Sequence, residues 1–312
     1  MKLAFLRSFL AFKAVKPAWA AIVLVVATGS VHAAAPLAYS VTDATGVRVD
    51  FAAPPQRIVS LLPSLAETVC ALGACHKLVG VDRYTVWPPE MAAVPKVGGG
   101  LDPNIEAIVA LKADVVLVSA SSRASARLRA LGQRVVVLEP KNHAEVKFVL
   151  FKIAQVLGQP PAAAESIWQD INQRIDRAAA DLPPALHHKR LYFEVSRGPY
   201  AAGESSFIGE TISRLGLGNV VGKQLGPFPK LNPEFVVLKN PDFILAGERH
   251  ADEMMLYPGW EKLPAVKAGR FCLFSLEQTD VLIHPGPRMG QAAELIAQCV
   301  RGKIKRPTRA RS

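Results

Sequence analysis

Short apolar runs alternate with helical patterns along most of this chain, and the same order of elements occurs twice. The strand-like runs lie at 57–62, 77–81, 114–118 and 134–138, and again at 191–195, 242–246 and 270–274. The helical patterns lie at 64–72, 104–111 and 124–131, and again at 206–215, 233–238 and 288–300. This alternation is typical of α/β domains with a largely parallel sheet. We therefore predict two Rossmann-like α/β lobes, at 36–158 and 185–300.

A different kind of segment, residues 159–184, separates the two lobes. Pro160-Pro161 opens it, Pro183-Pro184 closes it, and good helix formers fill 162–181. Proline in the first turn and just past the end is typical of a helix with defined ends. About twenty residues give a helix of roughly 30 Å. The sequence thus predicts a single rigid helix that bridges the lobes.

The two halves also share residues at equal spacing. Residues 104–117 align without gaps on 232–245, and Asn, Glu, Val, Asp and Leu recur at the same offsets. Separately, Glu67-Thr68 followed by Leu72-Gly73 is echoed by Glu210-Thr211 followed by Leu215-Gly216. Two matches in the same order indicate two similar lobes, and the period is too long for a solenoid.

The positive charge of the chain lies at its two ends. The formal net charge is +11, of which residues 1–33 carry four charges and 301–312 carry six, with no acidic residue in either segment. Residues 34–300 are left with a net +1. Nucleic-acid binding by the folded body is therefore not expected. We expect the basic tail at 301–312 to be disordered.

Residues 1–33 have the layout of a secretory signal peptide. Basic residues precede an apolar run at 18–28, and Val31-His32-Ala33 fits a cleavage site. The run is too short to span ~30 Å of hydrocarbon, so we expect cleavage and export. Export permits disulfides. The four cysteines, Cys70, Cys75, Cys272 and Cys299, allow three pairings, and buried free thiols stay an alternative.

Sequence motifs for catalysis are lacking. There is no dinucleotide-binding glycine motif, no Walker loop, no zinc-protease motif and no cysteine spacing of a metal site. We therefore predict a binding protein rather than an enzyme, with no bound cofactor and no metal. The competing class is an enzyme or cofactor carrier on the same two lobes, which turnover by the purified protein would reveal.

The informative residues are aromatic and lie in loops rich in proline and glycine. Tyr84 and Trp87 follow the second strand of the first half, Tyr200 follows the first strand of the second half, and Phe228 precedes a later helix. Open α/β sheets bind ligands at the carboxyl ends of their strands. We expect a ligand cleft between the lobes that is lined by flat apolar faces. The alternative is that each ring packs under its own loop.

Residues 56–300 resemble the periplasmic ligand-binding proteins of ABC importers, in which one long helix joins two lobes. The resemblance is strongest to the cobalamin-binding member of this family, and other members carry haem or ferric siderophores. The matching positions are Arg57–Gly73, Tyr84–Pro89, Asn104–Asp114, Pro199-Tyr200, Phe228–Glu234, Asp280 and Pro287-Arg288. The resemblance implies a periplasmic monomer that delivers a small-molecule ligand to an inner-membrane ABC permease dimer with its ATPase.

The resemblance also implies roles for individual residues. Tyr84, Tyr200 and Phe228 would contact a corrin-like ring with help from Trp87, and Asp280 would face its amide-bearing edge. Aromatic faces and amide acceptors suit such a ligand. The surface glutamates that dock on permease arginines, one per lobe, are matched by Glu106 and Glu234. Each also suits the first turn of its helix.

Two positions depart from the cobalamin pattern. Gly100 stands where that protein has a tryptophan, and His284 stands in place of an arginine in the last ligand loop. Haem, whose iron takes Tyr or His, is therefore an alternative ligand. An anionic ferric siderophore is another, because it would suit Arg83, Arg197, Lys230 and Arg288. Cobalamin or a related corrinoid is the predicted ligand.

Overall fold

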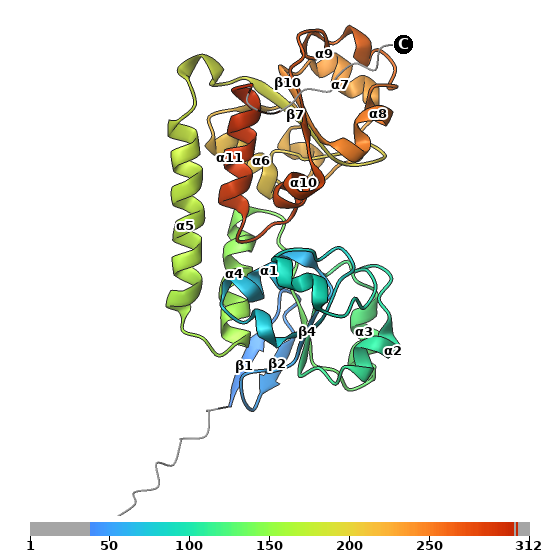
Figure 1. Cartoon of the computed structure of the whole chain (residues 1–312), viewed down its shortest axis with the longest axis vertical. Helices are drawn as coiled ribbons and strands as arrows, with labels where there is room; N and C mark the ends of the chain where they lie inside the picture. Colours follow the sequence, from blue (N-terminus) through green and yellow to red (C-terminus); the bar gives the residue numbers. More distant parts are fainter. Residues whose placement is uncertain (1–37, 303, 305–312) are drawn as a thin grey trace, which may run out of the picture. The chain divides into compact units, whose positions relative to one another are not determined.

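The computed structural model describes residues 38–302 and 304 (Figure 1). The predicted signal peptide at 1–33 lies outside the described residues, as does nearly all of the predicted tail. Within the described part, no helix has both the length and the apolar character needed to cross a membrane.

The N-terminal lobe is built on a four-stranded parallel sheet of strand order β4-β3-β5-β6. Its strands are β3 (Ile58–Ser60), β4 (Leu78–Val81), β5 (Val115–Val118) and β6 (Val135–Val137). Its helices are α1 (Pro63–Ala71), α2 (Ile105–Ala110), α3 (Ala124–Ala130) and α4 (His143–Val156). Along β5, Val115 and Leu117 enter one apolar cluster while Val116 and Val118 enter another. Both faces of the sheet are thus covered, as expected for parallel strands.

The C-terminal lobe has a five-stranded mixed sheet. Parallel strands β11 (Phe271–Phe274), β10 (Phe243–Gly247) and β7 (Arg190–Ser196) form its centre. Strand β8 (Tyr200–Ala201) pairs antiparallel with β7, and β9 (Gly218–Asn219) pairs parallel with it. The helices are α6 (Phe207–Arg214), α7 (Pro233–Lys239), α8 (Ala251–Met254), α9 (Pro264–Lys267), α10 (Leu276–Ile283) and α11 (Met289–Val300). The two-lobed α/β prediction is confirmed.

The predicted bridging helix is α5 (Pro161–Ala180), which packs against α4 along one half of its length and against α11 along the other (Figure 1). Ile171 and Ile175 are fully buried along its inner face. Arg174 forms a bidentate pair with Glu294 of α11, at 2.9 Å for both contacts. These contacts fix α5 to elements of both lobes.

The repeated segments fold alike at both ends of their helices. Asn104 caps α2 and Asn232 caps α7, and each side chain accepts a hydrogen bond from a first-turn N–H, at 2.9 and 3.0 Å. After each helix the chain turns through a left-handed residue, Lys112 with φ 48° and Asn240 with φ 43°. The internal repeat predicted from the sequence is therefore a repeat of structure.

The repeat continues into the strands. Asp114 accepts the backbone N–H of Arg57 at 2.8 Å, and Asp242 accepts that of Arg190 at 2.9 Å. Each arginine donates from its guanidinium to the C-cap carbonyl of the repeated helix, at 2.7 and 2.9 Å. In each lobe the same pair of side chains joins the first parallel strand to the end of that helix.

Both pairs of cysteines form disulfides, which decides a question that the sequence left open. Cys70 is bonded to Cys75 at the end of α1, and Cys272 is bonded to Cys299. The second bond joins β11 to α11. Pairing of this kind fits a protein that is exported to an oxidising compartment.

Several elements of the structure were not predicted from the sequence. The hairpin β1 (Tyr39–Thr42) and β2 (Arg48–Phe51) precedes the first lobe's sheet, and helices α4 and α10 were not predicted. Helices α8 and α9 and six 3₁₀ segments were also missed, namely Cys75–Lys77, Pro89–Ala93, Pro184–Leu186, Lys223–Leu225, Glu248–His250 and Trp260–Lys262.

Candidate ligand-binding site

Asp82 holds two loops of the N-terminal lobe together. It follows β4 and is buried. Its Oδ1 accepts the N–H of Tyr84 at 2.7 Å, and the N–H of Gly100 donates to the same carboxylate. Burial raises the pKa of Asp82, and the two amides lower it less. The loop that carries Tyr84 is therefore fixed at its start.

Lys96 closes the same loop from its far end. Its Nζ donates to the carbonyl of Thr85 at 2.6 Å and to that of Met91 at 2.9 Å. Burial lowers the pKa of Lys96. The segment that contains the predicted aromatic residues Tyr84 and Trp87 is thus held by partly buried polar contacts.

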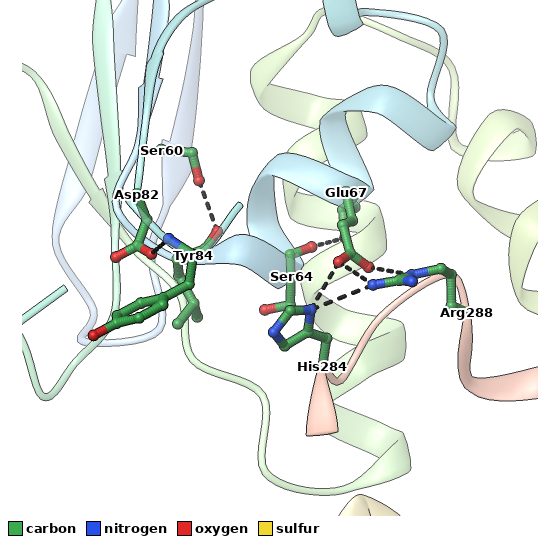
Figure 2. A network of polar contacts seen from close by, with 9 residues as sticks. Ser60, Ser64, Glu67, Asp82, Tyr84, His284 and Arg288 are labelled. Atoms are coloured by element: carbon green, nitrogen blue, oxygen red, sulfur yellow. Dashed lines mark hydrogen bonds and ion pairs between the residues drawn. The ribbon is translucent and has the colours of Figure 1, made fainter. Parts of the chain in front are cut away.

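A buried ion pair joins the two lobes beside this loop (Figure 2). Glu67 of α1 and Arg288, which precedes α11, are 1% and 6% exposed. The Arg288 Nε lies 2.9 Å from one Glu67 oxygen, and its Nη2 lies 2.5 Å from the other. Nδ1 of His284 lies 2.8 Å from Glu67 Oε1. One carboxylate of the first lobe therefore holds two side chains of the second.

Trp87 covers the guanidinium of Arg288, whose central carbon lies 4.8 Å from the ring centroid. With Glu67 beneath it and Trp87 above it, Arg288 has no free charge to offer a ligand. The expectation that Arg288 serves an anionic siderophore is therefore wrong. Arg83 is likewise paired with Asp102, at 2.6 Å.

A cavity of about 310 Å³ lies between the lobes. Its lining includes Leu62, Ser64, Glu139, Pro140 and Lys141 of the first lobe and Val195, Phe207, Ile208, Phe228, Ile283, His284 and Pro285 of the second. The volume is at the low end of the ~300–1,000 Å³ of small-molecule sites. At one side of it, the N–H of Phe207 donates to the carbonyl of Lys141 at 2.7 Å.

The structure brings some of the predicted ligand contacts together and leaves others apart. Phe228 and His284 line the cavity, and Phe228 packs on Phe207 with ring centroids 5.8 Å apart. Tyr84 and Tyr200 do not line it, and they are 62% and 41% exposed. Trp87 is half-buried on Arg288. The two exposed tyrosines would therefore contact only a ligand that extends beyond this cavity.

Asp280 lies on α10, one turn before His284. Burial raises its pKa, while the nearby charges of His284 and Arg288 lower it and that of Glu67 raises it. Its carboxylate is therefore close to the ion pair and to the histidine that lines the cavity.

The local backbone explains why a glycine stands at position 100, where the cobalamin pattern has a tryptophan. A Cβ at this position would lie 2.9 Å from the carbonyl oxygen of Leu61. Any side chain here would require a shift of backbone. The chain thus has no room for a ring at Gly100 in its present conformation.

The two predicted docking glutamates are exposed in the first turns of repeated helices. Glu106 lies on α2 and Glu234 on α7. Arg127 lies 3.4 Å from Glu106, and both side chains are mostly exposed. Such exposed pairs contribute little to stability. Neither glutamate is fixed in a structural role.

Sequence reasoning missed two residues of this site. Glu67 was noted only as part of the repeat with Glu210, and its pairing with Arg288 across 221 positions leaves no local pattern. Ser64 lines the cavity, and its hydroxyl is buried without a hydrogen-bond partner among the described residues. In residues 38–302 and 304, no group of three or more His, Cys, Asp or Glu is arranged to hold a metal ion.

Two α/β lobes joined by one helix, with a cavity between them, define a ligand-binding protein of the transport type. Residues 58–274 match the family model described as periplasmic binding protein, and the chain belongs to that family. The family is one of binding proteins rather than enzymes.

Two curated relatives match most of the chain. A Bacillus subtilis protein described as an uncharacterized ABC transporter substrate-binding lipoprotein, YvrC, is 28% identical over 279 residues, which cover 84% of this chain and 85% of the relative. A Vibrio cholerae vitamin B12-binding protein is 25% identical over 252 residues, which cover 78% and 88%.

Solved structures of the same class share the fold. The periplasmic vitamin B12 binding protein BtuF of Vibrio cholerae superposes with a TM-score of 0.66 and 24% identity, covering 80% of this chain and 98% of that one. A periplasmic heme binding protein from Pseudomonas aeruginosa gives a TM-score of 0.69 and 23% identity, covering 81% and 95%. These structures show that the fold is shared, and the family model shows that the chain is a periplasmic binding protein.

Proposed function

We propose that this protein captures cobalamin or a related corrinoid between its lobes and delivers it to an inner-membrane ABC importer. It does so as a periplasmic monomer after removal of residues 1–33. The observation that carries the choice of ligand is the charge of the cavity lining, in which one acidic and one basic residue leave no net charge.

The cavity lining has one acidic residue, Glu139, and one basic residue, Lys141. The arginine beside it, Arg288, is already neutralised by Glu67. Haem propionates and ferric siderophores bring negative charges that need partners when they are buried. A corrinoid offers neutral amides, whose N–H groups suit carboxylate acceptors such as Asp280. This charge balance supports a neutral, amide-bearing ligand, as does the sequence relative named for vitamin B12.

Titration of the purified protein with cyanocobalamin, haemin and a ferric siderophore tests the choice of ligand. We expect a calorimetric signal with cyanocobalamin and weaker or no binding of the two anionic ligands. A Soret shift with haemin and no heat with the corrinoid would overturn the proposal.

Haem is the second candidate because of two exposed phenols and one imidazole. Tyr84, Tyr200 and His284 are the residue types that haem iron takes as ligands. Haem binding would require a cation for each propionate, and Lys141 and Lys230 are the residues to substitute. If haemin binds, Lys141→Ala should weaken it and leave any corrinoid affinity unchanged.

Delivery is proposed to use Glu106 and Glu234. Because the repeat places one in each lobe, the pair suits a permease dimer with one equivalent basic site per subunit. A Glu106→Ala/Glu234→Ala double variant should bind ligand normally and fail in transport by a reconstituted importer. Asp170→Ala, a change on the exposed surface of α5, is the control that should transport normally. Weakened ligand binding by the double variant would contradict a docking role.

A further inference from the structure

The C-terminal lobe contains a second cavity, of about 230 Å³, away from the candidate ligand-binding site. Its lining includes Phe243 and Phe271, the first residues of β10 and β11, together with the end of α11. Ligands of open α/β sheets bind at the carboxyl ends of the strands, whereas these two residues lie at the amino ends. No described residue lines both cavities. The second cavity is therefore a separate feature of the lobe.

Two arginines line this cavity, Arg270 directly before β11 and Arg301 directly after α11. Among the described residues, no acidic side chain lines it. None of the ion pairs in residues 38–302 and 304 includes either arginine. The Nε atom of each is buried and has no hydrogen-bond partner in the same part of the chain. Buried donors are nearly always paired, so two such arginines at one cavity indicate an anionic partner.

The contacts that the described protein offers do not neutralise the two guanidinium groups. The central carbon of Arg270 lies 5.9 Å from the ring centroid of Phe243. Nη1 of Arg301 lies 3.5 Å from the carbonyl oxygen of Asp181. The C-terminal ends of α9 and α11 favour a cation nearby, but a helix end carries only a partial negative charge. Two full positive charges therefore lie at one cavity without a full counter-charge.

The second disulfide holds the two arginines in place. Arg270 lies two residues before Cys272. Arg301 lies two residues after Cys299. The bonded cysteines also line the cavity, so one covalent link joins the two segments that carry the guanidinium groups. An anion between them would meet donors that are already positioned, and less conformational entropy would be lost on binding.

The N-terminal lobe has an arginine at the equivalent position, and its surroundings differ. Arg134 directly precedes β6, an edge strand of its sheet, as Arg270 directly precedes the edge strand β11. The carbonyl of each accepts an N–H of the neighbouring strand, from Val116 at 2.8 Å and from Ile244 at 3.0 Å. Arg134 is exposed, whereas Arg270 is half-buried at the cavity. Arg134 is thus a matched control for Arg270.

We propose that this cavity binds a small dianionic oxyanion of the phosphate class. Arg270 and Arg301 carry two positive charges, which a dianion balances and a single carboxylate does not. A guanidinium group donates paired N–H groups to the oxygens of such an anion. The rings of Phe243 and Phe271 also offer an apolar wall to a phosphate monoester with a small apolar substituent. The site is independent of the proposed function.

Calorimetric titration of the purified protein with inorganic phosphate, phenyl phosphate and acetate tests the proposal. At about pH 8 and constant ionic strength, the two phosphates are mostly dianionic. We expect one phosphate per chain and weaker or no binding of acetate. Arg270→Gln and Arg301→Gln should each weaken phosphate about tenfold or more, because each removes hydrogen bonds to a charged group. Arg134→Gln should bind phosphate as the wild type does.

The two phosphates distinguish the sources of the anion. Tighter binding of phenyl phosphate would identify an organic monoester, whereas equal or weaker binding would identify the inorganic ion. Arg301→Lys keeps the charge without the planar fork and should lose less affinity than Arg301→Gln. Thermal unfolding without anion verifies that the variants are folded. Absence of phosphate binding by the wild type, or unchanged affinity in an Arg270→Gln/Arg301→Gln double variant, would overturn the inference.

Discussion

Helices α1 and α6 occupy equivalent places in the two lobes, yet they make different contacts with the opposite lobe. Each ends at a glycine with φ 75°, Gly73 or Gly216. Each carries a glutamate that reaches across. Glu67 of α1 accepts the guanidinium of Arg288, and Glu210 of α6 accepts the N–H of His143 at 2.6 Å.

The two contacts differ in what the glutamate neutralises. Glu67 faces a full positive charge that is removed from water. Glu210 faces the first residue of α4, where an unpaired N–H and the positive end of the helix favour an anion. The first contact involves His284, which lines the cavity, and the second lies next to α5, where the His143 ring packs edge-on against Trp168. The repeated sequence thus supplies a carboxylate at equivalent positions, and the partner lobe determines its use.

Replacement of Glu67 should lower the stability of the protein more than replacement of Glu210. Glu67→Ala leaves Arg288 buried without a counter-charge, and we expect a loss of about 3–5 kcal/mol of unfolding free energy. Glu210→Ala removes one hydrogen bond to a charged acceptor and should cost about 1.5–3 kcal/mol. Urea denaturation with unchanged m-values measures both.

The double variant Glu67→Leu/Arg288→Met is the control for the charge argument. Because it removes both charges and keeps the volume, it should be clearly more stable than Glu67→Ala. If the double variant is as unstable as Glu67→Ala, packing rather than the unpaired charge explains the loss.

The contact of Glu210 is also predicted to depend on pH through its neighbour. Burial lowers the pKa of His143 below 6.5, and the charge of Glu210 opposes this shift only in part. Between pH 6.5 and the lowered value, the unfolded chain binds a proton that the folded protein does not. Stability should therefore fall as the pH falls through this range.

His143→Gln should reduce that pH dependence. Its amide can still donate to the Phe207 carbonyl or to Thr211, which lie 3.1 and 2.9 Å from the histidine Nε2. We expect the unfolding free energy of the variant to change less than that of the wild type between pH 7 and 5. Equal slopes for the two proteins would mean that other groups are responsible.

Most strands and helices of the two lobes were predictable, because their apolar residues follow the periods of a buried strand or an amphipathic helix. Helix α4 was missed although Val146, Val149, Leu150 and Ile153 recur at helical spacing and are buried. Helix α10 was missed although Ser275 and Gln278 form a capping box. Both signals were present in the sequence, so these are errors of interpretation.

The site was less predictable for a physical reason. Phe228 was predicted as a ligand contact because it lies in a loop rich in proline and glycine, and His284 because it stands in the last ligand loop of the family that the chain resembles; both line the cavity. The pairing of Glu67 with Arg288 joins residues from two lobes, and only the arrangement of the lobes brings them together. The same arrangement makes Arg288 unavailable to a ligand, which no local pattern indicates.

The smallest change in stability is predicted at an equivalent position of the two lobes, where the backbone conformation is the same and the residue differs. Lys112 and Asn240 both follow their helices with a positive φ, and both are exposed. Asparagine tolerates this conformation better than lysine, and glycine adopts it without strain. Lys112→Gly should therefore stabilise the protein by roughly 0.5–1 kcal/mol, whereas Asn240→Gly should change it by a few tenths at most. Urea denaturation measures both changes. Equal gains at the two positions would contradict the prediction, because they would mean that lysine and asparagine lose the same free energy in this left-handed conformation.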